Sequence, residues 1–133
     1  MQAHLVQIKH NQEFHTLIDS TYPGRFNDWK ITILFYIANH SLKALASLNN
    51  IDIGNSHFDN FNNINPRMHN PLMPIDDKQY SRYRYLYKSS RSVRYDCIID
   101  PSRLGDLKED HQKCIEALNL FMNFIAAQGV VFL

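Results

Sequence analysis

The sequence predicts an all-α fold, an antiparallel up-and-down four-helix bundle formed by one domain over residues 1–133. Two observations lead to this prediction. Apolar residues recur at helical spacing in four substantial segments, and no segment shows the sustained alternation of apolar and polar residues that a half-buried strand requires. The links between the four segments are moderately short, which suits antiparallel neighbours.

The first two predicted helices cover about residues 3–19 and 29–48. Apolar side chains recur along the first at roughly helical spacing: Leu5, Ile8, Phe14, Leu17 and Ile18. Pro23 and Gly24 interrupt the chain after it, and Asn27 or Asp28 is expected to cap the second helix. The second helix is apolar on nearly every face, so we expect it to lie at the centre of the fold.

Residues 55–75 are expected to contain a short extra helix followed by irregular chain. Ser56 can cap this helix, which carries His57, Phe58 and Phe61. Three prolines in residues 64–75 then exclude regular structure.

Two more long helices complete the prediction. Asp76 or Asp77 is expected to cap the first of them, and residues 96–106, which include Pro101, are expected to end it. The last helix has an apolar stripe that contains one histidine: Leu107, His111, Cys114, Leu118, Phe121 and Ile125. Gly129 is expected to end that helix in a left-handed cap, and residues 130–133 form an apolar tail that docks on the body or on a second subunit.

Composition limits the classes of function. The formal net charge is +1, so any basic surface must be local. Cys97 and Cys114 lack the Cys-x-x-Cys spacing of zinc sites, which favours two free thiols. The start, MQAHLVQIKH, lacks the pattern of a secretion signal, and no uncharged apolar run approaches the roughly 20 residues of a membrane span. We therefore expect a cytoplasmic protein without membrane contact.

Residues 80–95 are rich in tyrosine and arginine. A nucleic-acid surface would use exposed rings for stacking and arginines for phosphate. Here most tyrosines coincide with the apolar stripe, so the pattern favours core packing for them and solvent for Arg82, Arg84 and Arg91. Arg94 differs because it lies near the helix end, followed by Tyr95. We expect Arg94 to be partly buried and paired with a carboxylate or an anionic ligand.

Histidines supply the other candidate site residues. Tyr36 and His40 lie four residues apart on one helix face. Two interpretations remain open: both are core-edge residues with partners across the bundle, or His40 faces the helix that contains Arg94. His57, at a helix N-terminus, is either a surface or cap residue or a binder of anions. A metal site built from His40, His57 and His69 matches no zinc spacing, so no metal or cofactor is predicted.

Three segments, WKITILFYIANHSLKALA, SHFDNF and YRYLYKSSRSVRYD, resemble in order and spacing small bacterial and archaeal members of the HEPN superfamily. The resemblance covers roughly residues 26–125 and implies an up-and-down helical bundle, usually dimeric. It implies a toxin paired with a nucleotidyltransferase antitoxin, a ribonuclease of a defence system, or a non-catalytic nucleotide-binding or helper module. Active HEPN ribonucleases carry an arginine, four to six residues and then a histidine near the start of the last helix. The closest pair here is Arg103 and His111, with seven residues between them.

Three functional hypotheses follow. The first is a non-catalytic, homodimeric HEPN-like module that binds a nucleotide, RNA or a protein partner, such as a nucleotidyltransferase-type antitoxin. Its polar groove would contain the following residues: Tyr36, His40, His57, Arg94 and Tyr95.

The second hypothesis is a divergent, metal-independent ribonuclease. In it, His111 or His57 is the general base for a ribose 2′-hydroxyl, and Arg94 or Arg103 stabilises phosphate charge. The third is a helical interaction protein that dimerises through residues 130–133. The near-neutral charge favours the first and third over a general RNA binder.

Overall fold

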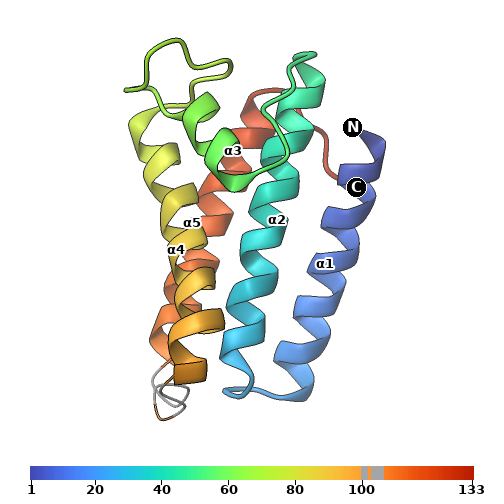
Figure 1. Ribbon diagram of the computed structural model, residues 1–133. Coiled ribbons are helices and arrows are strands. Elements are labelled where there is room, and N and C mark those ends of the chain that lie inside the picture. Colours follow the sequence, from blue (N-terminus) through green and yellow to red (C-terminus); the bar gives the residue numbers. More distant parts are fainter. Residues whose placement is uncertain (100–101, 103–106) are drawn as a thin grey trace.

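The computed structural model describes residues 1–99, 102 and 107–133, with the side chains of residues 96–99 outside that description. Over the described residues the chain is all-helical, with no strand. Its helices are α1 (Gln2–Thr21), α2 (Asn27–Leu48), α3 (His57–Ile64), α4 (Asp77–Ile99) and α5 (Lys108–Ala127). Four long helices lie side by side, and the short α3 lies across the upper part of α2 and α4 (Figure 1). The predicted helices and the short extra helix are confirmed.

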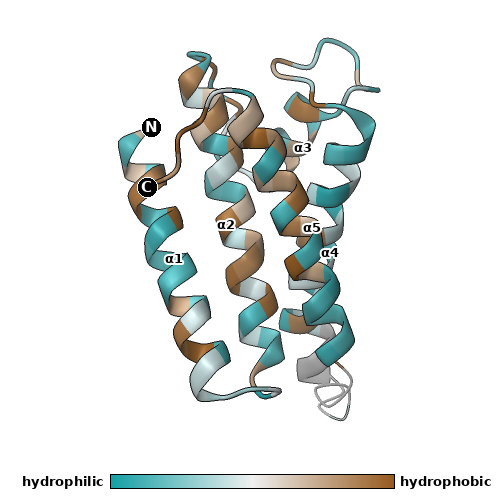
Figure 2. Ribbon diagram, turned by 180° about the vertical axis from the view of Figure 1, so that it is seen from behind, coloured by the Kyte–Doolittle hydropathy of each residue, from teal (hydrophilic) through white to brown (hydrophobic). Residues whose placement is uncertain are grey.

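The central position predicted for α2 is confirmed. α2 packs against α1, α4 and α5, and most of its side chains are buried. Hydrophobic residues occupy much of α2, whereas α1 and α4 are largely hydrophilic on the outside (Figure 2). Within the described part of the chain, α2 is the helix long and apolar enough to cross a membrane by length and composition, and 67% of that stretch is buried inside the protein. Packing at the centre of the fold accounts for its hydropathy.

The start of α2 differs from the prediction. The cap position is Phe26, in a left-handed conformation with φ 56°, rather than Asn27 or Asp28. The carbonyl of Phe26 accepts a hydrogen bond from the Lys30 amide at 3.0 Å, so Asn27 and Asp28 already belong to the first turn. Asp28 therefore places a carboxylate in the first turn, where the helix dipole favours negative charge.

The caps predicted for α3 and α4 are confirmed. The Ser56 hydroxyl accepts the Asp59 amide at 3.1 Å, and the Asp76 carboxylate accepts the Gln79 amide at 2.9 Å. The buried Asn60 side chain fixes the preceding loop because it donates to the carbonyls of Ile53 and Gly54.

The end predicted for α4 was wrong, because the helix continues through residues 96–99 instead of breaking at residue 96. Residues 100, 101 and 103–106, including Arg103, lie outside the described part of the chain.

The stripe predicted for α5 is buried, and Gly129 ends the helix with φ 110°, as expected. The Gly129 amide donates to the carbonyl of Ala126 at 3.0 Å. In the tail, Val130 is buried against the body, but Val131 is 80% exposed. The tail therefore docks only in part on its own chain.

The loop before α3 gives a test of the fold. Gly54 has φ 93°, and a Cβ there would lie 2.7 Å from the Cβ of Asp59. Gly24, with φ 75°, has open space around it. Both Gly→Ala substitutions strain the backbone, at a cost of about 1–2 kcal/mol, but only Gly54→Ala also forces α3 to move. Urea denaturation should show a larger loss of unfolding free energy for Gly54→Ala, and equal losses would contradict the role of Asp59.

Candidate functional site

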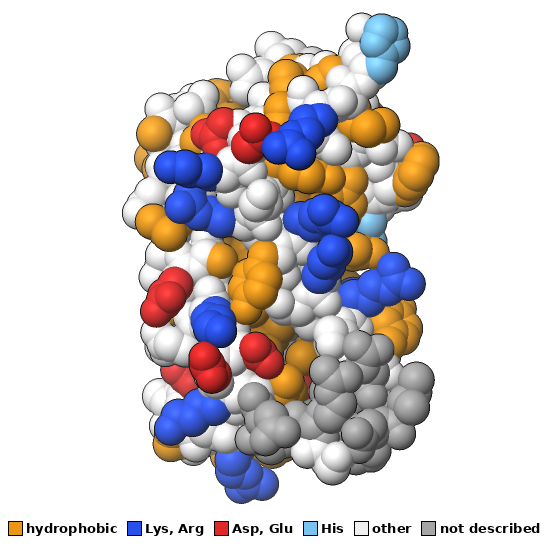
Figure 3. Space-filling model, turned by 90° about the vertical axis from the view of Figure 1, so that its left-hand side faces the viewer, with side chains coloured by type: hydrophobic (Ala, Val, Ile, Leu, Met, Phe, Trp, Pro, Cys, Tyr) orange, Lys and Arg blue, Asp and Glu red, His pale blue; other side chains and the backbone are white. Residues whose placement is uncertain are grey.

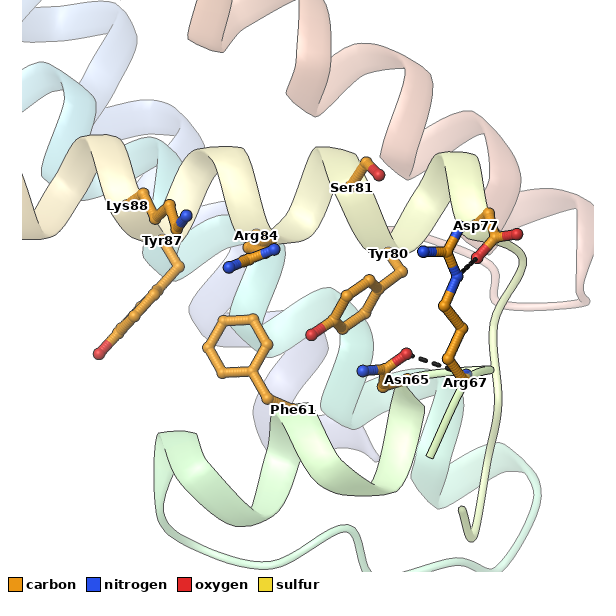
Figure 4. Close-up of a pocket in the computed structure, with 9 residues that line it drawn as sticks. All are labelled: Phe61, Asn65, Arg67, Asp77, Tyr80, Ser81, Arg84, Tyr87 and Lys88. Carbon is orange, nitrogen blue, oxygen red and sulfur yellow. Dashed lines mark hydrogen bonds and ion pairs between the residues drawn. The ribbon is translucent and has the colours of Figure 1, made fainter. Parts of the chain in front are cut away.

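Two hollows adjoin along α4 and share Tyr87 and Lys88. The first has a volume of about 510 Å³ and lies between α3, α4 and the connection that joins them (Figure 4). Its lining mixes aromatic, basic and polar side chains: Phe61, Asn65, Arg67, Asp77, Tyr80, Ser81, Arg84, Tyr87 and Lys88. The second, of about 580 Å³, continues toward the end of α4 and is lined by Tyr87, Lys88, Arg91, Ser92 and Tyr95. Together they are called the α4 groove below.

Aromatic rings form one wall of the α4 groove. The ring of Phe61 packs edge-on against Tyr80 and Tyr87, with centroid distances of 6.1 Å and 4.9 Å. Tyr80 and Tyr87 are half-buried, while Tyr83 behind them is fully buried. Core packing, predicted for most of the tyrosines, is complete for Tyr83 and partial for Tyr80 and Tyr87. Tyr95, predicted as a site residue, is 56% exposed. The groove has rings held by the core and accessible from outside.

Cations line the other part of the α4 groove. Arg84, Lys88 and Arg91 are exposed and follow one another at intervals of four and three residues, so they share one face of α4. Arg67 approaches from the connection, with its Nε 3.4 Å from the Asp77 carboxylate (Figure 4). Lysine and arginine side chains, interspersed with carboxylates, appear on this side of the molecule in Figure 3. Arg84 and Arg91 are exposed as predicted, whereas Arg82 is half-buried. Arg84 and Arg91 also line a groove, which the spacing did not predict.

His57 lies between the aromatic core and the α4 groove. The His57 ring packs against Phe35 and Tyr87 at 5.5 Å and 5.1 Å. Burial lowers the pKa of His57, and the nearby charges of Arg94 and Lys43 lower it further. His57 is thus a neutral side chain between the core and the groove.

Arg94 is half-buried, as predicted, and sits at the edge of the groove. Its Nε donates to the carbonyl of Ser90 at 3.2 Å. The guanidinium groups of Arg91 and Arg94 lie 5.9 Å and 5.6 Å from the centre of the Tyr95 ring. The Tyr95 ring therefore lies near both guanidinium groups.

Tyr36 and His40 are not among the residues that line the α4 groove. Tyr36 is half-buried and packs beside Phe35, at 5.5 Å. His40 meets α1 instead of α4, because its Nδ1 lies 3.0 Å from the Nδ1 of His4. The interpretation with a partner across the helices is therefore the correct one for His40. Burial and the neighbouring His4 and Lys43 lower its pKa.

A second polar cluster surrounds His111, in the first turn of α5. The His111 side chain is buried, and its Nε2 lies 2.9 Å from the Nε2 of His15 on α1. Beside the pair, the fully buried Nζ of Lys30 donates to Asp19 at 3.0 Å and to the carbonyl of Tyr22 at 2.7 Å. A cavity of about 610 Å³ opens here, lined in part by Asp19, Lys108, Glu109 and His111.

The chemistry of this cluster is that of a neutral imidazole. Burial and then His15 lower the pKa of His111 to about 4, so at neutral pH it accepts a proton rather than holding one. Sequence reasoning found His111 but missed His15, Asp19 and Lys30. One signal was present, since a lysine inside an otherwise apolar central helix needs a buried partner.

No metal centre is formed by the described side chains, since no three His, Cys, Asp or Glu residues among them are placed to hold an ion. In particular, His69 is exposed on the connection, whereas His40 contacts His4 and His57 contacts Phe35. The buried Cys114 is a free thiol whose pKa burial raises to about 11, so it is an unreactive core residue.

Comparisons of the chain with protein-family models, with curated proteins and with solved structures found no match.

The His111 pair predicts how stability depends on pH. The pKa of His111 is about 4 in the folded chain against an ordinary 6.5, so the unfolded chain takes up the proton first as the pH falls. The contribution of neutral His111 to the unfolding free energy is fully present above pH 6.5 and is lost as the pH falls from 6.5 to about 4. From about pH 7.5 to about pH 5, the unfolding free energy should fall by about 2 kcal/mol from this residue.

Urea denaturation at the two pH values measures this fall. His111→Gln should show a smaller fall than wild type, whereas His10→Gln, at an exposed histidine of α1, should retain it. An equal fall in both variants would rule out His111 as the source.

Proposed function

We propose that this protein is a non-catalytic binding module that holds a single-stranded RNA segment or a nucleotide in the α4 groove. We infer with it that the four long helices form an antiparallel up-and-down four-helix bundle of the HEPN type. One observation carries the proposal: Arg84, Lys88 and Arg91 form a row of cations beside the accessible rings of Tyr80, Tyr87 and Tyr95, along two adjoining hollows.

The arrangement matches the two needs of single-strand recognition. Bases stack on aromatic faces, and every base offers such a face, while cations beside the rings attract the phosphates. Arg84 and Arg91 are seven residues apart, about 10 Å along the helix, which is room for more than one phosphate of an extended strand. With a net charge of +1, the attraction is confined to the groove, so we expect a short bound segment.

The HEPN-like proposal extends to assembly. We propose a homodimer, supported by the exposed apolar Val131 and Leu133 in the tail, and a nucleotidyltransferase-type antitoxin as a partner. The homodimer and the antitoxin partner are proposed separately from binding in the α4 groove.

The binding proposal is tested by charge removal at the groove. Fluorescence anisotropy with a labelled single-stranded RNA should show binding to the wild type, and Lys88→Ala/Arg91→Ala should weaken it about tenfold or more. Because each single-strand phosphate contact contributes about −0.7 to the slope of log K against log salt, the variant's slope should be shallower by about 1.4.

The matched control is Lys9→Ala/Lys113→Ala, which removes the same charge from α1 and α5. It should bind like wild type. The proposal fails if the wild type binds neither RNA nor nucleotide, or if the control loses as much affinity as the groove variant.

The His111 cluster supports a second candidate function, metal-independent cleavage of RNA. The supporting observation is a neutral His111 that lines an open cavity beside Asp19, His15 and the Lys108 side chain. A neutral imidazole can remove the proton of a ribose 2′-hydroxyl, and the oxygen then attacks the adjacent phosphorus and expels the 5′-oxygen, which takes a proton from water to become a 5′-hydroxyl.

In that case the wild type should cleave end-labelled RNA, in the presence of EDTA, to fragments ending in a 2′,3′-cyclic phosphate. His111→Ala should reduce the rate by about 10²-fold or more, with His10→Ala as the control. Inert wild-type protein at several pH values would eliminate the ribonuclease and leave the binding module.

A further inference from the structure

The one tryptophan of the chain lies on the surface. Trp29 is 61% exposed, although most side chains of α2 are buried. Large aromatic side chains left in water are a feature of binding surfaces. Trp29 lines a hollow of about 130 Å³ together with Asp28, Thr32, Val93 and Arg94. This hollow lies between the start of α2 and the end of α4, and none of the functions above uses it.

Apolar, polar and charged side chains line the hollow, which suits a planar heterocycle with polar edges. Val93 is buried and supplies an apolar floor. The Thr32 hydroxyl donates to the Asp28 carbonyl at 2.9 Å, which ties Thr32 to its own helix. Asp28 contributes a carboxylate, and Arg94 a guanidinium held in place by the Ser90 carbonyl and the Tyr95 ring.

The hollow adjoins the α4 groove. Tyr95 lines the second part of that groove, and the guanidinium of Arg94 lies 5.6 Å from the same ring. Arg91, on the groove side, lies 5.9 Å from it. A strand that follows the groove toward the end of α4 therefore reaches the hollow past Tyr95, with an arginine on each side for phosphate.

We propose that this hollow binds the guanine base of a strand or nucleotide held in the α4 groove, an inference that rests on the function proposed above. The hollow, about 130 Å³ in volume, is small, in keeping with one base of a single strand. The Trp29 ring supplies a stacking surface.

The carboxylate of Asp28 selects the base. Guanine presents two adjacent donors on its Watson–Crick edge, N1–H and the 2-amino group, which match the two oxygens of one carboxylate. Adenine and cytosine present one amino group and uracil one N–H on that edge. A matched bidentate contact discriminates by about 1–3 kcal/mol, which corresponds to roughly 5-fold to 150-fold in affinity.

Intrinsic fluorescence gives a direct test, because Trp29 is the only tryptophan. Guanosine monophosphate should quench the fluorescence at lower concentration than the adenosine, cytidine or uridine nucleotides. A labelled oligouridylate that contains one guanosine should bind at least fivefold more tightly than oligouridylate alone. Asp28→Asn should abolish this preference and leave the affinity for oligouridylate unchanged, since an amide offers only one acceptor oxygen.

The control is Asp59→Asn, which removes a first-turn carboxylate from α3 and should keep the guanosine preference. Circular dichroism of both variants should match that of the wild type, which checks that they are folded. RNA binding by anisotropy with no change in tryptophan fluorescence and no guanosine preference would overturn the pocket and leave the groove proposal standing. Quenching by guanosine monophosphate without RNA binding would support the pocket and restrict the ligand of the α4 groove to a nucleotide.

Discussion

The buried ammonium group of Lys30 is the constraint on which the His111 cluster and the turn before α2 depend. Its side chain is fully buried in the central helix, and the Asp19 carboxylate and the Tyr22 carbonyl meet its charge. The Asp19 side chain is 44% exposed, but the fully buried ammonium group of Lys30 still needs both partners. The end of α1 and the turn after it are therefore fixed relative to α2. Because His15 lies one turn before Asp19, the same contact brings it to His111.

The His111 cluster and the α4 groove lie on different helices. Neutral histidines join α1 to α2 and α5, whereas cations and accessible rings line α4. None of the residues that line the His111 cavity also lines the α4 groove. The residues that would bind a strand in the α4 groove therefore do not place it at His111. This separation supports the proposal of binding without cleavage.

Sequence periodicity predicted the helices and their buried faces because a stripe at 3.6-residue spacing has only one side to bury. Ser56 and Asp76 were found as caps because capping is local. His4 and His40 are 36 positions apart in the sequence, and His15 and His111 are 96 positions apart. Tertiary packing alone brings each pair together. The row of Arg84, Lys88 and Arg91 was visible in the spacing, but its place in a groove depends on how the irregular connection folds back over α4.

The turn before α2 shows how local strain serves the guanine pocket. A left-handed phenylalanine costs about 1–2 kcal/mol, and the tertiary contacts of the turn must offset it. The Phe26 ring packs edge-on against Tyr22 at 5.1 Å, and the Arg25 guanidinium lies 5.0 Å from the Phe26 ring. These contacts, with the Tyr22 carbonyl held by Lys30, fix the direction in which α2 begins. Asp28 and Trp29 are consequently held at the surface before any ligand arrives, which reduces the entropy that binding has to overcome.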